Sequence, residues 1–339
     1  MRRPSFFALA FLALAACAAP VDQGATQVAA STNETAPRAA ATSTTTTLRV
    51  VASNLTSGNR QSYDPGEGAR ILQALKPDVA LMQEFNYGRN TTAELTTFVH
   101  DTFGAEYTWS RETGAAQIPN GVVSRYPIVA KGQWADPQTS TRSFAWARID
   151  VPGDRDLWTI SVHLLTSGAS RRQAEANAIV ARVRAEIPAG DYVVLGGDFN
   201  TGSRTEQCIR TFGSLFKTQG PYPVDTRGNG GTSASRGSPY DWVLASPALD
   251  ALETPAVVGG VSFTHGMVFD SRNFDPLANV APVRRSDSGA VNMQHMAVVR
   301  DFALPVPEEP PVVVEAPDAG ATEPEAPAPD ADASAPANE

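Results

Sequence analysis

The segment VVLGGDFNTG, residues 193–202, places a carboxylate and a carboxamide directly after an apolar run and two glycines. Val193–Leu195 predict a strand that is covered on both faces, and the glycines leave room for a close approach to the backbone. Because alternate strand side chains point to the same side, Asp198 and Asn200 are predicted to share a face, with Phe199 opposite. Ligands bind at such strand ends in α/β folds. An ordinary Asx turn is the alternative for this segment alone.

Polar residues also end other strand-like runs of the chain. LRVVASN ends at Asn54 and DVALMQE ends at Glu84, with the helix-like GEGARILQALKP between them. WTISVHL carries His163 and is followed by the helix-like RRQAEANAIVARVRAEIP, which precedes the opening segment. Further strand-like runs are GVVSRYPIVA, SFAWARIDV, YDWVLAS and HMAVVRDFAL. The pattern predicts an α/β fold in which mixed sheets pack together with helices outside.

The N-terminal sequence MRRPSFFALAFLALAACAAP is typical of an export signal, because two arginines precede a short apolar run. Its end, Leu14–Cys17, resembles the bacterial lipobox. We therefore expect residues 1–17 to be a lipoprotein signal peptide and Cys17 to become the lipid-modified first residue, with a plain signal peptide as the alternative. Ala18 provides no signal for retention in the inner membrane, so we expect an envelope protein anchored in the outer membrane. Cys208 then has no cysteine partner for an intrachain disulfide.

Two segments have compositions that predict disorder: an Ala/Thr/Ser linker at 18–46 and an acidic Pro/Ala-rich tail at 305–339. Residues 47–304 between them suit one large α/β domain. The tail contains nine acidic and no basic residues, so the formal charge of −9 minus −9 leaves zero for residues 1–304. A nearly neutral domain weakens the case for a high-affinity DNA-binding protein.

Over 47–304 the chain resembles the endonuclease/exonuclease/phosphatase superfamily, which has the DNase I-like fold. The resemblance rests on the order of its motifs, which are Asn54, Gln83-Glu84, Ser-Arg-Tyr-Pro-Ile at 124–128, His163, Gly-Asp-Phe-Asn at 197–200, Asp241 and His295. It implies a four-layer α/β sandwich, in which two mixed β-sheets pack face to face with helices outside. The active site of such a fold lies where the strand ends meet.

Hydrolysis of a phosphodiester needs a cation, an activated water and hydrogen-bond donors to the phosphoryl oxygens. The resemblance implies that Glu84 binds Mg²⁺, with Mn²⁺ as the alternative, because a hard cation needs few carboxylates. Asp198 would orient and deprotonate the water, and Asn54 and Asn200 would donate to the phosphate. A carboxylate accepts a hydrogen bond from water, and a carboxamide donates one to the phosphate, so the two groups suit the same strand end.

The resemblance also implies that His295 contacts the scissile phosphate and that Asp241 keeps it protonated. His163 would donate to the phosphate or to the leaving oxygen. One departure concerns the metal, since Gln294 stands where the family has an aspartate before its last histidine. Asp287 could replace that carboxylate only if its loop folds back. Otherwise divalent binding is weakened or depends on Glu84 alone.

These residues predict a metal-dependent phosphodiesterase, and an exported nuclease ranks first. A sphingomyelinase-like phospholipase or a phosphatase shares the same catalytic set, because that set defines the reaction and not the substrate. The substrate is therefore expected to be nucleic acid or a phospholipid head group, and the lipid anchor implies membrane contact. A catalytically weakened surface-binding lipoprotein is the alternative from another class. The sequence leaves the oligomeric state open.

Overall fold

The computed structural model describes residues 44–56, 66–114, 117–291 and 293–307. The predicted signal peptide with Cys17, most of the linker and almost all of the acidic tail lie outside these ranges. Within the described part, no helix has the length and apolar character needed to cross a membrane.

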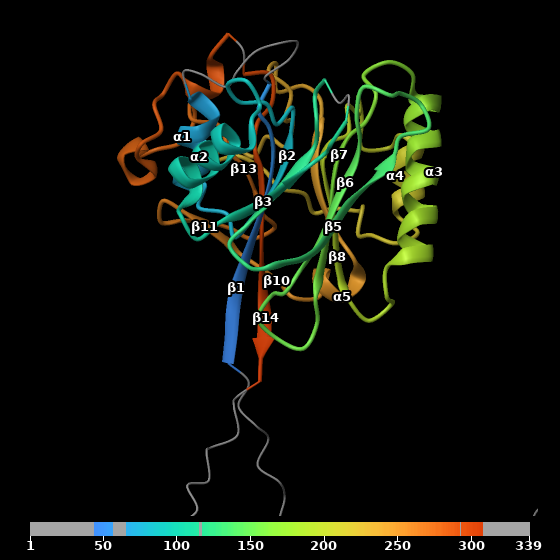
Figure 1. Ribbon diagram of the computed structural model, residues 1–339. Helices are drawn as coiled ribbons and strands as arrows, with labels where there is room; N and C mark the ends of the chain where they lie inside the picture. Colours follow the sequence, from blue (N-terminus) through green and yellow to red (C-terminus); the bar gives the residue numbers. More distant parts are fainter. Residues whose placement is uncertain (1–43, 57–65, 115–116, 292, 308–339) are drawn as a thin grey trace, which may run out of the picture. The chain divides into compact units, whose positions relative to one another are not determined.

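Two β-sheets lie face to face (Figure 1). The larger sheet has the strand order β10 (Glu253–Thr254), β14 (Val298–Val306), β1 (Thr44–Asn54), β2 (Val79–Gln83), β4 (Gly121–Ser124) and β3 (Thr108–Arg111), and β13 (Met267–Val268) also pairs with β14. The second sheet has the order β5 (Ile128–Ala135), β6 (Ser143–Ile149), β7 (Leu157–His163), β8 (Tyr192–Asp198) and β9 (Asp241–Ala245). A separate small hairpin joins β11 (Ala256–Val258) and β12 (Val261–Phe263). Strands β1 and β2 run parallel, as do β7 and β8, so the predicted repetition of strand, helix and strand is present.

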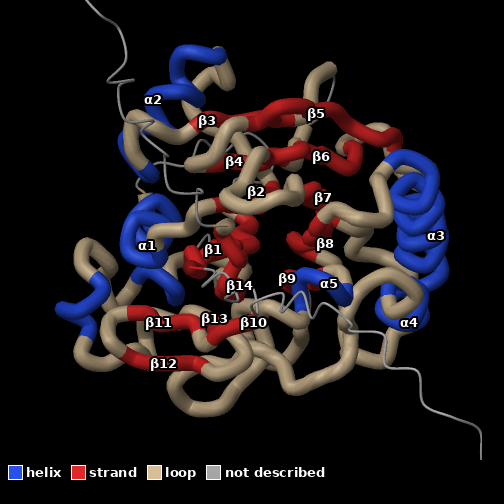
Figure 2. The backbone as a smooth tube through the Cα atoms, turned by 90° about the horizontal axis from the view of Figure 1, so that it is seen from below, coloured by secondary structure: helices blue, strands red, loops and turns tan. Residues whose placement is uncertain are grey.

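Helices cover the outer faces of both sheets (Figure 2). On the larger sheet lie α1 (Glu67–Leu75) and α2 (Thr92–Phe103), and on the second sheet lie α3 (Ala169–Glu186) and α4 (Gln207–Phe212). The remaining helical segments are α5 (Pro247–Asp250), η1 (Leu277–Val280) and η2 (Asp287–Gly289). Helix, sheet, sheet and helix give the predicted four-layer α/β sandwich.

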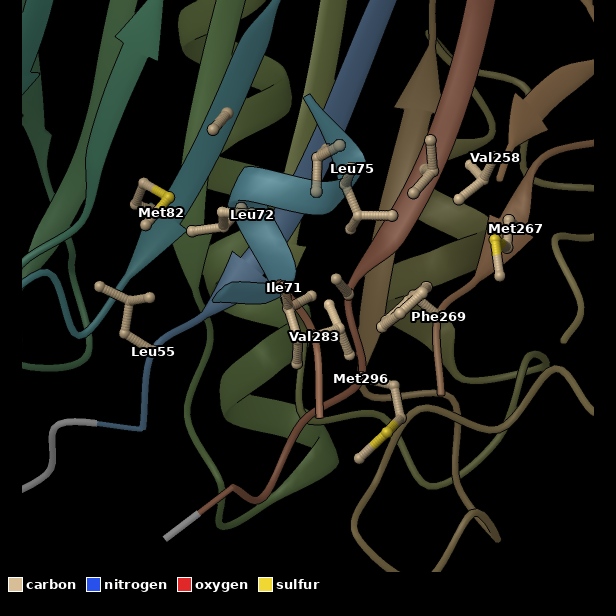
Figure 3. Close-up of a cluster of buried hydrophobic side chains, with 14 of the residues drawn as sticks. Leu55, Ile71, Leu72, Leu75, Met82, Val258, Met267, Phe269, Val283 and Met296 are labelled. Carbon is tan, nitrogen blue, oxygen red and sulfur yellow. The ribbon is translucent and has the colours of Figure 1, made fainter. Parts of the chain in front are cut away.

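Three apolar clusters fill the spaces between these layers. Between the sheets, the central cluster includes Leu48, Leu81, Val194 and Phe302, all fully buried. The cluster beneath α1 holds the apolar face of that helix and extends to Met296, which neighbours the site residue His295 (Figure 3). Cys208 belongs to the cluster beneath α3 and α4 and is a free, buried thiol. The packed core thus extends to the base of the candidate site.

The folded domain is slightly longer than the predicted range 47–304. β1 begins at Thr44 and β14 ends at Val306, and these two residues pair in an antiparallel ladder. Three threonines assigned to the linker therefore form a strand, which suits their β-branched side chains. The composition of the linker concealed this because threonine is common both in strands and in polar tethers.

The Ser-Arg-Tyr-Pro-Ile motif crosses from one sheet to the other. Ser124 ends β4 in the larger sheet and Ile128 begins β5 in the second sheet, so GVVSRYPIVA is two strands rather than one. Arg125 forms an ion pair of 2.7 Å with Asp78. The Arg125 side chain therefore has a structural role in joining this motif to Asp78.

Candidate active site

The side chains predicted to form the site gather where the strands end. Asn54 is the last residue of β1, and Glu84 directly follows β2. In the second sheet, His163 pairs with Asp198 between β7 and β8, and Asp198 pairs with Asp241 between β8 and β9. Because β1 and β2 pack against β7, β8 and β9, both sets of strand ends lie on the same side of the sandwich.

Asp198 is the centre of these contacts and is almost completely buried. Its Oδ2 atom accepts hydrogen bonds from Nδ2 of Asn54 at 3.1 Å and from Nδ2 of Asn200 at 3.2 Å. The Nε2 atoms of His163 and His295 lie 3.2 and 3.5 Å from the same oxygen. One carboxylate oxygen is thus surrounded by four side-chain nitrogens, which hold it in a single orientation.

Asn200 reaches this point by a turn and not by strand alternation. β8 ends at Asp198, and Asn200 has the left-handed φ of 51°. Its backbone N–H donates to Oδ1 of Asp198 at 2.8 Å, which is an Asx turn. The turn considered as the alternative is therefore present, and it directs the Asn200 side chain back toward Asp198.

Left-handed backbone recurs around the site. Glu84 has a φ of 51° and Thr56 a φ of 53°. Residues other than glycine seldom adopt this conformation, and it tends to cluster at functional sites. The side chain of Glu84 accepts a hydrogen bond of 3.3 Å from Nδ2 of Asn54, which also contacts Asp198. Asn54 therefore links the two carboxylates.

Glycines beneath the strand end allow this close approach. A Cβ atom on Gly196 would lie 2.6 Å from Cδ1 of Leu81, and one on Gly197 would overlap the carbonyl oxygen of Val162. Gly197 also has a φ of 131°, which side-chain-bearing residues rarely adopt. The prediction that these glycines remove side chains where the backbone is closely approached is confirmed.

His295 and Asp241 form a buried hydrogen-bonded pair. Nδ1 of His295 lies 3.0 Å from Oδ2 of Asp241. Burial disfavours the charged imidazolium, but the carboxylates of Asp241 and Asp198 outweigh it and raise the pKa of His295 to about 10. His295 therefore carries a positive charge at neutral pH, as predicted for a group that faces a phosphate.

The other two central groups have shifted pKa values as well. Burial, reinforced by the negative charge of Asp241 and opposed by His295, raises the pKa of Asp198 to about 7. Burial, together with the nearby positive charges of Arg142 and His295, lowers the pKa of His163 well below its ordinary value. The site thus combines one charged and one neutral histidine with a carboxylate that can gain or lose a proton near neutrality.

Arg142 is part of this region but was not predicted from the sequence. Its side chain is buried, and Nε donates to the carbonyl oxygen of His163 at 2.5 Å while Nη2 donates to that of Leu164 at 3.1 Å. Leu164 also accepts a hydrogen bond from Nδ2 of Asn200. Arg142 therefore anchors the chain where β7 ends. The available signal was a charged residue at the head of the apolar run SFAWARIDV.

Asp287 does not serve as the replacement metal ligand that its sequence position allowed. Its two carboxylate oxygens accept hydrogen bonds from Nε and Nη2 of Arg70 at 3.0 and 2.7 Å, and Oδ2 also accepts from the backbone N–H of Arg284. The loop folds back onto α1 instead of onto Glu84. Gln294 is exposed, and its backbone N–H donates to Oγ1 of Thr56 at 3.3 Å.

Thr232 connects the backbone of Asp241 to that of Met296, the residue after His295. Its Oγ1 atom accepts a hydrogen bond of 2.7 Å from the N–H of Asp241. Its carbonyl oxygen accepts one of 2.8 Å from the N–H of Met296, the residue after His295. Ser233 forms a β-bridge with His295 itself. Thr232 thus fixes Asp241 and the end of the His295 segment relative to each other.

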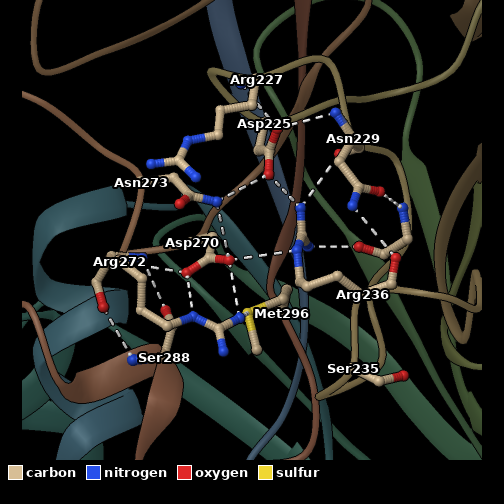
Figure 4. Close-up of polar contacts among 12 residues, drawn as sticks. Asp225, Arg227, Asn229, Ser235, Arg236, Asp270, Arg272, Asn273, Ser288 and Met296 are labelled. Carbon is tan, nitrogen blue, oxygen red and sulfur yellow. Dashed lines mark hydrogen bonds and ion pairs between the residues drawn. The ribbon is translucent and has the colours of Figure 1, made fainter.

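A buried ion network holds the loop that carries Thr232 (Figure 4). Arg236 contacts the carboxylates of both Asp225 and Asp270, and Asp270 also pairs with Arg272 at 2.8 Å. The two carboxylates and Arg236 are buried, and the partly exposed Arg272 balances the remaining negative charge. Arg272 additionally lies 3.8 Å from Sδ of Met296. The network therefore supports both sides of the Thr232 contact.

The family model that matches the chain is that of the endonuclease/exonuclease/phosphatase family, and it covers residues 67–264. The chain belongs to this family. Its members are hydrolases that act on phosphoester bonds. No curated protein sequence matches the chain significantly.

Solved structures of family members share the fold. An endonuclease/exonuclease/phosphatase from Beutenbergia cavernae is 18% identical with a TM-score of 0.53, and the match covers 76% of this chain and 72% of that one. Family proteins from Bacteroides thetaiotaomicron and Bacteroides vulgatus are 15% and 14% identical, both with TM-scores of 0.52. These matches cover 77% and 76% of this chain and 98% and 99% of the other two. At such low identity, the structures establish the fold alone.

The donor atoms at the centre are close enough to hold a metal ion. Asp198, Asp241 and His295 offer ligand atoms that lie within 4.8 Å of one another. However, a histidine that carries two protons cannot ligate a metal, and the high pKa of His295 favours that state. Glu84 is the remaining carboxylate of the site, and one or two carboxylates suffice for Mg²⁺, which keeps several waters. The residues fit a hard divalent cation at the Glu84 side.

Proposed function

We propose that this protein is an exported, metal-dependent phosphodiesterase and that its substrate is nucleic acid. The observation that carries the proposal is the arrangement around Asp198. A carboxylate whose pKa is raised to about 7 lies 3.5 Å from the Nε2 atom of a histidine that is charged at that pH. A base that can take a proton thus stands beside a cation that can stabilise an oxyanion.

In the proposed reaction, Asp198 accepts a proton from water as the water oxygen forms a bond to phosphorus and the bond to the leaving oxygen breaks. The imidazolium of His295 donates to a phosphoryl oxygen, and Asp241 holds the ring in place. Asn54 and Asn200 supply further N–H donors at the same point. A divalent cation bound by Glu84 would neutralise charge on the phosphoryl group. His163 would contribute a neutral N–H group.

The surface favours nucleic acid over a phospholipid. Among the described residues, the large hydrophobic side chains that are exposed are Val129, Val257 and Val291. A phospholipase needs an apolar surface to enter the membrane interface, and aromatic side chains usually provide it. Three scattered valines do not form such a surface, so phospholipid hydrolysis ranks second. Export and anchoring through Cys17 remain predictions from the N-terminal sequence.

The proposed function is tested with the purified full-length protein. We expect hydrolysis of bis(p-nitrophenyl) phosphate in Mg²⁺ or Mn²⁺, its loss in chelator, and faster turnover of DNA or RNA than of sphingomyelin. Faster hydrolysis of sphingomyelin than of DNA and RNA would make a phospholipid the preferred substrate and contradict the proposal of nucleic acid. The absence of metal-dependent hydrolysis of every substrate would instead favour the surface-binding lipoprotein.

Metal affinity is expected to respond to position 294 and not to position 287. Gln294→Asp adds a carboxylate next to His295 and should lower the Kd for Mg²⁺ by about tenfold. Asp287→Asn should leave the Kd unchanged. It should instead destabilise the fold by about 2 kcal/mol, because it breaks a largely buried ion pair with Arg70 that keeps some solvent contact. Calorimetric metal titration and denaturant unfolding give both results without an activity assay.

The opposite effect of these two variants on the Kd for Mg²⁺ would contradict the assignment of Asp287 to the ion pair with Arg70. If Asp287→Asn weakened metal binding and Gln294→Asp did not strengthen it, the loop carboxylate would be a ligand. Arg70→Gln provides a matched control, since it breaks the same ion pair while the carboxylate remains. It should reproduce the loss of stability and, like Asp287→Asn, leave the Kd unchanged.

Thr232 should affect turnover through its hydroxyl group. Thr232→Val keeps the side-chain shape but leaves the buried N–H of Asp241 without its acceptor. We expect kcat to fall by about fivefold at unchanged KM, which corresponds to about 1 kcal/mol for one lost hydrogen bond. Thr232→Ser retains the acceptor and should keep kcat within about twofold of the wild type. Equal losses in both variants would assign Thr232 a packing role only.

A further inference from the structure

A cavity lies where the loop after β8 meets the chain around β12. Its volume is about 600 Å³, within the range of small-molecule binding sites. It is lined by Arg204 from the loop after β8, by Tyr222 from the segment after α4, by Phe263 at the end of β12, and by His265 from the turn between β12 and β13. We call it the Arg204 pocket.

Arg204 is held rigidly in this pocket. Its guanidinium carbon lies 4.0 Å from the ring centre of Tyr222 and 5.0 Å from that of Trp242. Its Nη2 atom donates to the carbonyl oxygen of Gly230 at 2.7 Å. Two cation–π contacts and one hydrogen bond fix the planar group against the cavity wall. An arginine fixed in this way loses little further entropy when it binds a ligand.

The charge of Arg204 has no carboxylate partner among the described residues. Five other partly buried arginines pair with acidic groups at 2.5 to 2.8 Å; these are Arg49, Arg70, Arg172, Arg236 and Arg300. Arg111 and Arg142 instead donate to carbonyl and amide oxygens, as Arg204 does. Burial lowers the pKa of Arg204, and of the titratable neighbours only Tyr222 opposes that shift. A partly desolvated cation beside a cavity is complementary to an anion.

The pocket is connected to the active site by short stretches of chain. Arg204 follows Asn200 by four residues, so their Cα atoms are at most about 14 Å apart. Gly230, which Arg204 contacts, precedes Thr232 by two residues. Trp242, on which Arg204 stacks, directly follows Asp241. An anion in the pocket would therefore lie within a few nucleotide lengths of Asp198, since stacked nucleotides repeat at about 3.4 Å along a strand.

We propose that the Arg204 pocket binds a phosphate group of the polynucleotide substrate, a few nucleotides away from the phosphate that is cleaved. The inference rests on the proposed function and deepens it by naming an extended nucleic-acid strand as the substrate. It also explains how a domain with a formal charge near zero can bind such a strand. Individual arginines placed along the path of the backbone replace a broad basic surface.

The test compares Arg204→Gln with Arg227→Gln. Arg227 is exposed in the loop that contains Gly230, so its variant removes the same charge close by without altering the pocket. Kinetics are measured with a single-stranded oligonucleotide and with bis(p-nitrophenyl) phosphate, which is too small to span both sites. The selectivity is the ratio of kcat/KM for the oligonucleotide to kcat/KM for the small ester.

In Arg204→Gln we expect the selectivity to fall by about tenfold, mainly through KM for the oligonucleotide. The slope of log KM against log salt concentration should also decrease in size by about 0.7, which is the value for one phosphate contact on a single strand. Arg227→Gln should change neither quantity. Equal changes in both variants would indicate nonspecific charge effects and overturn the proposal, as would an unchanged selectivity in Arg204→Gln.

Failure of the pocket and failure of the proposed function give different results. If the wild type hydrolyses the small ester with metal but Arg204→Gln retains full selectivity, only the pocket is wrong. If the wild type hydrolyses nothing, the proposed function fails. Binding of a fluorescent oligonucleotide in chelator then tests the pocket by itself, and an affinity equal in wild type and Arg204→Gln would overturn it.

Discussion

Asp198→Asn should lower kcat by a factor of about 10² to 10⁴, which is the usual contribution of a general base. The variant keeps the size of the side chain and an oxygen that can accept hydrogen bonds from Asn54 and Asn200. It loses the negative charge, and with it the ability to take a proton from water, and its NH2 group replaces one of the two oxygens that accept hydrogen bonds. Because burial already disfavours the ionised carboxylate, removal of the charge should cost little stability. Turnover of bis(p-nitrophenyl) phosphate at saturating metal measures the effect.

A matched control separates this effect from a general change of charge. Asp101→Asn makes the same substitution at an exposed position of α2 and should leave kcat unchanged. Circular dichroism and thermal unfolding check that all three proteins are folded. Wild-type turnover by Asp198→Asn would exclude Asp198 as the base, and the water would then have to be activated by another group.

The sequence was sufficient to predict the site residues that lie at the ends of strands. Asn54, Asp198 and Asp241 lie at the ends of apolar runs, and the pairing of β7, β8 and β9 brings such ends together. Hydrophobic patterns locate strands because one pattern is repeated over several residues. The position of a residue at the end of a strand therefore follows from information that is local in the chain.

Residues just beyond the strands were harder to place. Glu84 and Asn200 have left-handed backbone, which alternation along a strand does not predict. Their side chains turn toward the site because Asx-type turns and close backbone contacts override the extended pattern. The motif order of the family identified both residues, but the geometry that directs them came from the structure.

Contacts between distant segments were not predictable from one sequence. Asp287 pairs with Arg70, which is 217 residues away, so nothing near Asp287 revealed that its carboxylate was already engaged. Thr232 and Arg142 were missed for the same reason. Thr232 accepts a hydrogen bond from Met296, which is remote in the chain, and Arg142 donates to the carbonyl oxygens at the end of β7, which is a different strand. Such roles depend on tertiary packing, which local patterns do not encode.

His295→Gln should abolish most turnover, with kcat reduced by a factor of about 10² to 10³, as expected for the loss of a charged donor to the phosphoryl oxygens. Glutamine keeps a polar N–H group at this point but cannot carry a positive charge. KM for the small ester should change less than kcat, because the imidazolium is most valuable when charge accumulates in the transition state. Steady-state kinetics at neutral pH provide the measurement.

The pH profile of the wild type should follow the two shifted groups. Asp198 must be ionised to act as a base, so kcat should rise with pH through about 7. His295 must remain protonated, so kcat should fall as the pH passes about 10. Asp241→Asn removes the carboxylate that stabilises the imidazolium most and should lower the pKa of His295. The alkaline limb of the profile should then move toward neutral pH. An alkaline limb that stays in place in Asp241→Asn would show that this aspartate does not control the charge of His295, and the role assigned to the pair would be wrong.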